Sequence, residues 1–221
     1  MPCPRGKRLF RTPGFPPRST QRHHSKINKL CLPAKHTKER ANYYLFAKFS
    51  VFRGQILNMA VRRITEYPEA VLAEVGKPVE KFDKELADLC ADMFDTMYDA
   101  EGVGLAAPQI GLNLRLFVMD CAGIKLIAAN PEIVHTDGEQ SGQEGCLSVG
   151  KVPAVVVRPM KARLKAQNEK GEWFEADADG YAARCFMHET DHCNGKLFID
   201  HLPKMRREMI VKRFKKEKNW K

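Results

Sequence analysis

Two histidines four residues apart are the residues of this chain whose types and spacing most directly indicate chemistry. They belong to the segment His188-Glu189-Thr190-Asp191-His192. On an α-helix, positions i and i+4 lie on the same face, so both imidazoles can bind one metal ion. Glu189 lies one step round the helix, where its carboxylate can reach a water molecule on the metal. The segment predicts a metal-binding helix of a hydrolase, but HExxH also occurs in unrelated helices and needs support from elsewhere.

A metal site built on this helix needs a third protein ligand, and the chain offers candidates on both sides. Zinc proteases usually take it from downstream, where the candidates are Asp200, His201, Glu208 and Glu217. With one of them, the protein would be a zinc-dependent peptidase that cleaves internal peptide bonds. Upstream, Cys146 lies among small residues in QEGCLSVG, residues 143–150, a setting that suits a thiolate close to a metal.

A second run of small residues, GVGLAAPQIG at 102–111, follows a helical pattern. Gly102 and Gly104 are small enough to let the backbone come close to a ligand. Gln109, near the end of the run, has an amide that can donate a hydrogen bond to an oxyanion. Taken alone, the run is equally typical of a tight turn with close packing.

Together the three segments resemble the signature of the peptide deformylase family. The motifs are GxGLAAxQ at residues 102–109, EGCLS at 144–148 and HExDH at 188–192, about forty residues apart and in that order. The resemblance extends roughly from Met59 to the end of the chain. It implies removal of the N-formyl group from the N-terminal formyl-methionine of newly synthesised polypeptides, with release of formate.

The resemblance also implies a metal centre. It assigns Cys146, His188 and His192 as the ligands of one Fe(II) ion, and zinc, nickel or cobalt would suit the same donors. It assigns Glu189 as the group that accepts a proton from the attacking water and returns it to the departing amine.

Further roles follow from the same resemblance. The side chain of Gln109 and the backbone N–H of Leu147 are expected to stabilise the oxyanion. Val103 is expected to line the methionine pocket. The backbones of Gly104 and Gly145 are expected to pair with the peptide as a short added strand.

Several neighbours of the motifs carry further expectations. Glu144 and Arg158 match family positions that pair and steady the strand bearing the cysteine. Met187, Cys193 and Arg184 depart from the residues usual in the family, where Arg184 replaces an apolar residue near the methionine pocket. We expect the ligands and the base to be unaffected and the shape of the pocket to differ.

The elements that must position these residues predict an α+β fold. An apolar stripe at residues 82–97 indicates a long amphipathic helix that Gly102 ends. Short apolar or alternating runs at 114–120, 125–134, 152–159, 161–167 and 172–177 indicate mixed or antiparallel strands. Residues 181–194 indicate a helix that ends at Gly195 and carries HExxH, with the strands packed around it.

The last twenty residues predict a C-terminal helix. Its spacing places Met205, Met209, Ile210 and Phe214 toward the body of the protein. Its other face is rich in cations: Arg206, Arg207, Lys212, Arg213, Lys215, Lys216 and Lys218. Solvated charge is the simple interpretation. Under the deformylase hypothesis, this face instead contacts the ribosome.

The formal net charge of +10 belongs to the first part of the chain. Residues 1–58 carry 13 Lys and Arg against the single acid Glu39, whereas residues 59–221 carry 24 basic and 26 acidic residues. The first segment is predicted to be a disordered basic extension: a leader, a transit-like segment, or an artefact if translation starts at Met59. The nearly neutral body, residues 59–221, is predicted to be the catalytic domain, with no specific DNA binding.

Cysteine usage and hydropathy restrict the cellular compartments in which the protein is expected. The seven cysteines form an odd set without disulfide spacing, and no signal peptide precedes them, so a reducing compartment is expected. No apolar run has the length needed to span a bilayer. The predicted location is the cytoplasm, or a mitochondrion or plastid if residues 1–58 are a transit peptide.

Overall fold

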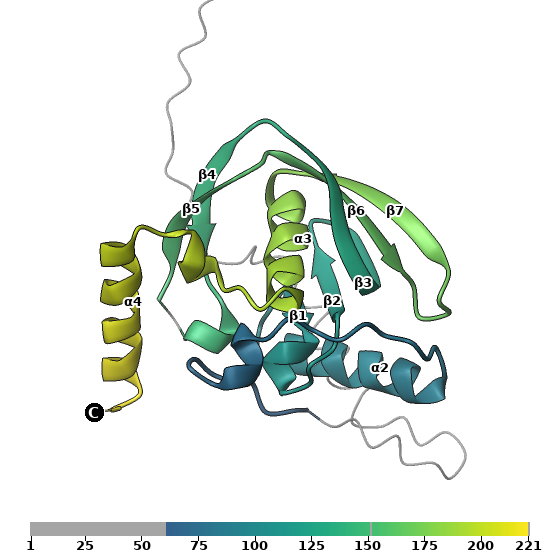
Figure 1. Cartoon of the computed structure of the whole chain (residues 1–221), viewed down its shortest axis with the longest axis horizontal. Coiled ribbons are helices and arrows are strands. Elements are labelled where there is room, and N and C mark those ends of the chain that lie inside the picture. The colour runs from purple at the N-terminus through teal and green to yellow at the C-terminus, as the bar shows by residue number, and fades with distance from the viewer. Residues whose placement is uncertain (1–60, 151, 221) are drawn as a thin grey trace, which may run out of the picture. The chain divides into compact units, whose positions relative to one another are not determined.

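The computed structural model describes residues 61–150 and 152–220, which form an α+β fold as predicted (Figure 1). The predicted extension, residues 1–58, lies outside the described residues. The helices are α2 (Lys84–Asp99), α3 (Gly180–Cys193) and α4 (Lys204–Glu217). The strands are β1 (Gly104–Ala106), β2 (Leu116–Cys121), β3 (Ile124–Asp137), β4 (Gln140–Glu144), β5 (Ala154–Arg158), β6 (Lys161–Gln167) and β7 (Trp173–Asp179). None of the helices described is long and apolar enough to cross a bilayer.

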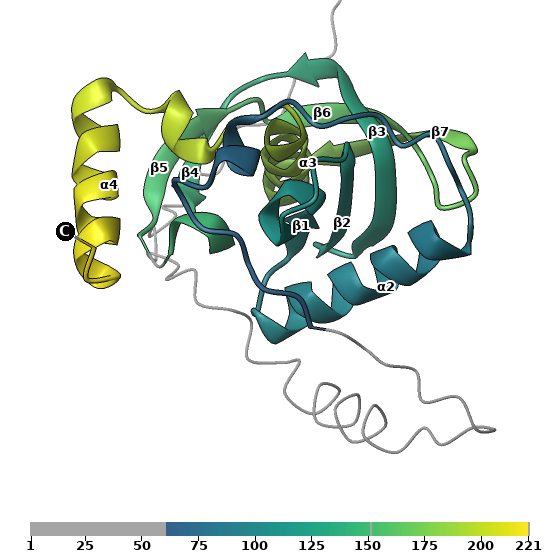
Figure 2. The same ribbon diagram turned by 60° about the horizontal axis from the view of Figure 1, so that its bottom comes forward.

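Two antiparallel sheets surround helix α3. Five strands form one sheet in the order β1-β2-β3-β6-β7, and β4 pairs with β5 in the other. Helix α3 contacts all five strands of the larger sheet. Figures 1 and 2 show that this sheet curves around the helix, while the β4–β5 pair lies on its other side. The helix that carries HExxH is therefore the central element, as predicted.

Helix α2 follows its sequence pattern closely. The side chain of Asp83 accepts a hydrogen bond from the backbone of Leu86 and caps the first turn, which stabilises such a helix by about 1 kcal/mol. Met93 and Met97 are fully buried, so the apolar stripe is core as predicted. The helix does end near Gly102, but the left-handed residue is Glu101, at φ +56°.

Two short strands, β1 and β4, were not predicted from the sequence. The run at β1, Gly-Leu-Ala, has no β-branched or aromatic residue, and the run at β4, Gln-Ser-Gly-Gln-Glu, has no apolar residue at all. Their strand conformation comes from pairing with β2 and β5, which is tertiary context that a local pattern does not contain. Strand β1 lies inside the predicted motif at 102–109, and β4 ends at the first residue of the motif at 144–148.

Helix α4 contacts the rest of the structure with fewer residues than predicted. Ile210 and Phe214 are buried as expected, but Met205 and Met209 are 74% and 66% exposed, so their predicted orientation is wrong. Ile210 and Phe214 are four residues apart and form a narrow buried stripe along the helix. Met205 and Met209 lie beside this stripe, on the solvent side. Near its end, the ammonium group of Lys218 binds the carboxylate of Glu66.

Candidate active site

Helix α3 presents its polar motif to the interior of the protein. Ten of its 14 residues are buried, among them Glu189 and His192, while His188 is half-buried. The rings of the two histidines lie edge to face with 5.0 Å between centroids. The predicted same-face arrangement of the histidines is therefore present, in a setting that excludes most water.

The third member of the predicted cluster comes from the turn after β4. The sulfur of Cys146 lies 3.3 Å from Nε2 of His192. One donor atom from each of Cys146, His188 and His192 falls within 4.8 Å of the others. The structure thus brings together three residues that the sequence separates by 42 and 4 positions, in an arrangement that can hold one metal ion.

The electrostatic environment favours the ligand form of Cys146. Burial alone would raise the pKa of its thiol, but His192 and His188 outweigh burial and lower the pKa to about 5. A thiolate is the form that binds metals. Nδ1 of His192 is buried and has no hydrogen-bond partner among the described residues, so the contact of this ring with Cys146 is made through Nε2 alone.

A buried ion cluster orients the other histidine. Nδ1 of His188 lies 3.0 Å from Oε2 of Glu144, which directs the opposite ring nitrogen, Nε2, toward the sulfur. Arg158 donates to both oxygens of Glu144, at 2.9 and 3.1 Å, so the predicted pair is present. Burial opposes ionisation of Glu144, but His188 and Arg158 hold its pKa far below the usual range. Metal-binding histidines commonly have such a carboxylate on the second nitrogen.

Glu189 is buried against the backbone of β1. A Cβ atom built on Gly104 would lie 2.3 Å from Oε1 of Glu189, so only glycine leaves space for this carboxylate. Oε2 of Glu189 is buried without a hydrogen-bond partner among the described residues. Burial raises its pKa. A buried, unpaired carboxylate with a raised pKa is typical of a group that exchanges protons.

The amide of Gln109 is fixed by its own turn. Its Oε1 accepts a hydrogen bond from the backbone of Ala106 at 2.8 Å, and its Nε2 lies 3.5 Å from the sulfur of Cys146. The amide donor therefore points to the same sulfur as the histidines. Leu147 follows Cys146 at the start of a 3₁₀ turn, Leu147–Val149. Both groups predicted to stabilise an oxyanion thus lie next to the cluster.

The three predicted substrate contacts lie at the start of β1 and just after β4. Gly104 begins β1, which is an outer strand of the larger sheet. Gly145 is exposed just after β4, and a Cβ atom there would meet nothing within 4 Å. Val103 is half-buried and packs against the cluster around Phe117 and Phe186. Strand β1 therefore has a strand partner on one side only, β2, and the backbone at Gly145 is exposed.

The downstream alternatives for a third ligand lie outside the cluster of Cys146, His188 and His192. Asp200 binds the backbone of Leu197 and the guanidinium of Arg207, and His201 binds Asp191 at 2.7 Å. Glu208 and Glu217 lie on the exposed surface of α4. Among the described residues, the only group of three or more metal-binding side chains is the one with Cys146. The zinc peptidase with a downstream ligand therefore does not fit.

The three departures from the family pattern each have packing or hydrogen-bond partners inside the protein. Met187 packs against Ala162 and Ala183, and Cys193 is fully buried in the core. The guanidinium of Arg184 donates to Oε1 of Glu144 at 2.6 Å. Sequence reasoning missed this contact. The available signal was an arginine four residues before His188, and hence on its face of the helix, within an otherwise apolar run.

Metal-dependent hydrolases are the class of protein that this scaffold and donor set define. The model of the polypeptide deformylase family matches residues 61–208. A peptide deformylase of Acidobacterium capsulatum is 44% identical over 163 residues, which is 72% of this chain and 96% of that protein. One of Clostridium botulinum is 49% identical over 146 residues, covering 66% and 99%.

Solved structures agree with the sequence comparison. The crystal structure of a peptide deformylase from Legionella pneumophila has a TM-score of 0.70 at 48% identity, covering 72% of this chain and 96% of that one. That from Ehrlichia chaffeensis in complex with actinonin has a TM-score of 0.69 at 33% identity, covering 72% and 98%. The chain belongs to the polypeptide deformylase family. These enzymes remove the N-formyl group from nascent polypeptides, so the activity predicted from the motifs is confirmed at the level of the family.

Proposed function

We propose that this chain deformylates nascent polypeptides with one Fe(II) ion bound by Cys146, His188 and His192. The observation that carries the proposal is the convergence of these three donors within 4.8 Å. One thiolate and two imidazoles suit Fe(II), and also zinc, nickel or cobalt. When bound, such an ion polarises a water molecule and the formyl oxygen and so promotes hydrolysis.

Glu189 is proposed as the general base and acid. Its carboxylate accepts a proton as water attacks the formyl carbon, and returns that proton to the nitrogen of the departing amine. The buried, unpaired Oε2 supports this role because no protein group in the described part of the chain competes for the proton. The raised pKa supports it too, since a base with a pKa nearer to neutrality exchanges protons more efficiently.

Gln109 and Leu147 are proposed to stabilise the charge that develops on the formyl oxygen. The Gln109 amide is already oriented by Ala106, so its donor needs no rearrangement during the reaction. The backbone N–H of Leu147 would supply a second donor. One such donor typically lowers a barrier of this kind by about 3 kcal/mol.

The peptide is proposed to bind as a short strand beside Gly104 and Gly145, with its methionine side chain near Val103. Strand β1 pairs with another strand on one side only, so its other edge is proposed to supply backbone groups for pairing, as in other cases of strand addition. The empty space at Gly145 supports close approach of a second backbone.

An anaerobic assay tests the proposal. Metal-free protein is loaded with Fe(II) and mixed with formyl-Met-Ala-Ser, and formate release is followed. Formate should appear only with metal, and Cys146→Ser should bind iron more weakly. Metal binding without formate release would reject the proposed activity, and cleavage of an internal peptide bond would favour a peptidase.

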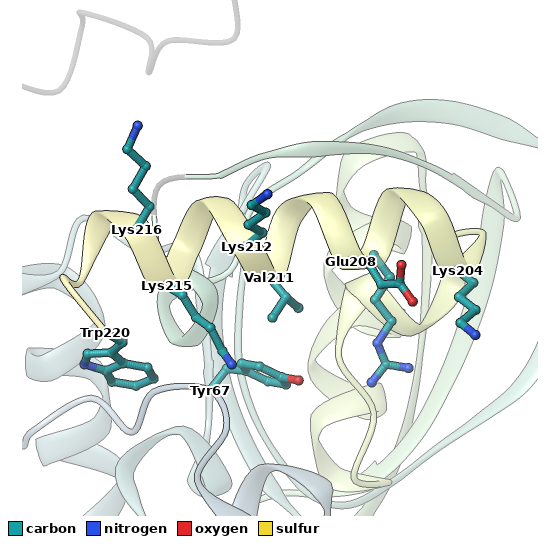
Figure 3. A pocket seen from close by; sticks show the side chains of 9 residues that line it. Tyr67, Lys204, Glu208, Val211, Lys212, Lys215, Lys216 and Trp220 are labelled. Atoms are coloured by element: carbon teal, nitrogen blue, oxygen red, sulfur yellow. The ribbon is translucent and has the colours of Figure 1, made fainter.

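We also propose that the cationic side of α4 docks the enzyme on the ribosome. A groove of about 910 Å³ lies between α4 and Tyr67, and Figure 3 shows Tyr67 and Trp220 beside the helix. Its cations are Lys204, Arg207, Lys212, Lys215 and Lys216. Phosphate backbones attract such clusters at low salt. Docking would place the enzyme in the cytoplasm, in keeping with the bacterial relatives, or in an organelle if residues 1–58 are a transit peptide.

Co-sedimentation with ribosomes at low salt tests the docking proposal. The double variant Lys215→Glu/Lys216→Glu should bind ribosomes more weakly, while turnover of a short formyl peptide stays unchanged. The matched control is Lys77→Glu/Lys81→Glu, which reverses two exposed cations outside the groove. Equal co-sedimentation of both variants would reject docking through α4.

A further inference from the structure

Arg184 is a buried cation that the proposed reaction does not use. It lies in α3, one turn before His188, and is 4% exposed. Its Nη1 donates to Oε1 of Glu144 at 2.6 Å and to the carbonyl oxygen of Val156 at 3.0 Å. This side chain therefore joins helix α3 to the β4–β5 pair at the carboxylate that contacts His188.

The contacts of Glu144 divide its two oxygens between different partners. Oε1 accepts from both arginines, Arg158 at 2.9 Å and Arg184 at 2.6 Å. Oε2 accepts from Arg158 at 3.1 Å and lies 3.0 Å from Nδ1 of His188. Arg158 alone could follow the carboxylate if it tilted, because it contacts both oxygens. The second arginine fixes Oε1 from another direction, and this leaves Oε2 facing the histidine.

Strand β4 leaves space for this arginine. A Cβ atom on Gly142 would lie 3.2 Å from Nη2 of Arg184, closer than a relaxed contact. The backbone of Gly142 is not in the left-handed region, so its conformation does not require glycine. The missing side chain instead makes room for the guanidinium group.

We propose that Arg184 is a positioning residue for the metal centre. By fixing Glu144, it holds Nδ1 of His188 in a hydrogen bond and keeps Nε2 directed at the position of the ion. The inference rests on the proposed metal site and extends it. Loss of a group that orients a ligand in this way typically weakens metal binding by about 10- to 100-fold.

Titration of the metal-free full-length protein with Co(II), followed by visible absorption, measures this effect. Arg184→Met keeps the apolar stem and removes every donor, so Co(II) should bind about 10- to 100-fold more weakly. Arg184→Lys retains one charged donor and should recover part of the affinity. The melting temperature of each metal-free variant is measured in parallel, because a purely structural role would change only that temperature.

Two further variants keep the test independent of folding defects at position 184. Gly142→Ala leaves Arg184 in place but displaces its guanidinium, and should weaken Co(II) binding by a smaller factor. The control is Arg115→Met. Arg115 also ties α3 to the sheet, through the carbonyl oxygens of Cys193 and Pro131, but does not contact Glu144. It should lower the melting temperature and leave Co(II) affinity unchanged.

The outcomes separate this inference from the proposed function. If wild-type protein fails to bind Co(II), the metal site itself is rejected. If wild-type protein binds and Arg184→Met and Gly142→Ala bind equally well, the positioning role is rejected and the metal site stands. If Arg115→Met weakens binding as much as Arg184→Met, the effect is general destabilisation and the inference is also rejected.

Discussion

Helices α3 and α4 have the same length, but α3 buries charged side chains and α4 exposes them. Each has 14 residues, yet α3 buries ten and α4 buries two. In α3, the guanidinium of Arg184 donates a hydrogen bond to Glu144, and the carboxylate of Glu189 packs against Gly104. The cations of α4 stay largely exposed. Charge content alone therefore does not decide exposure; what decides it is whether other elements supply partners that offset the loss of water.

The largest expected effect is that of Glu189→Gln in the buried helix. This change keeps the size of the side chain and removes its ability to carry a proton. The turnover number should fall by about 10²- to 10⁴-fold, the usual contribution of a general base. Formate release is measured on protein with verified metal content, which should stay at the wild-type level. A fall of less than tenfold would exclude Glu189 as the base.

The next expected effect is on ionisation at Cys146. Its pKa is about 5 in the folded protein, against 9.0 for an ordinary thiol. Because the pKa is lowered, the metal-free protein should carry a thiolate at this position above about pH 5. The ultraviolet absorbance of the thiolate is measured against pH, as the difference between wild-type and Cys146→Ser protein. A midpoint near 9 would show that the histidines do not stabilise the thiolate.

A smaller loss of turnover is expected for Gly104→Ala. The added Cβ would overlap Oε1 of Glu189 and push the carboxylate away, and misplacement by about 1 Å can reduce a rate by about 10²-fold. Gly145→Ala is the matched control, since its Cβ meets nothing in the free protein. It should affect the Michaelis constant more than the turnover number. Wild-type turnover in Gly104→Ala would mean that Glu189 is not held in place by this contact.

Much of the scaffold could be predicted because its elements carry strong local patterns. The stripe of α2, the alternation of β6 and the segment of α3 each gave the correct element within a few residues. The strands β1 and β4 could not be predicted, because three small residues and five polar residues have no strand period. Their conformation depends on partner strands that are distant in sequence.

The residues of the candidate site also divide into those that local sequence patterns indicate and those that they do not. The convergence of Cys146, His188 and His192 could be expected, because the spacing of the two histidines and the resemblance of three motifs to one family both indicated it. The contacts of Arg184 and of Gly104 were not predicted, because each depends on how α3 faces a strand that left no local pattern. The space at Gly142 and the close approach at Gly104 appear only when the backbones are placed side by side.

For helix α4 we predict two effects on stability, of which the larger is expected for Phe214→Ala. Its ring is fully buried and packs against Gly150, at the end of the turn that begins with Cys146. Removing it should lower the free energy of unfolding by about 3 kcal/mol, measured by urea denaturation. Trp220, whose ring centroid is 5.6 Å away, should report the change through its fluorescence. A loss below 1 kcal/mol would mean that α4 is not anchored by this residue.

The smallest effect is expected for Met205→Ser and Met209→Ser. The sequence pattern placed both methionines toward the body, where their truncation would cost about 2 to 5 kcal/mol. With 74% and 66% of these residues exposed, each change should alter the free energy of unfolding by less than about 0.5 kcal/mol. Urea denaturation of each variant beside Phe214→Ala distinguishes the two orientations. A loss above 2 kcal/mol would show that this face of α4 packs against the body of the protein. Helix α4 would then bury more of its residues, as α3 does.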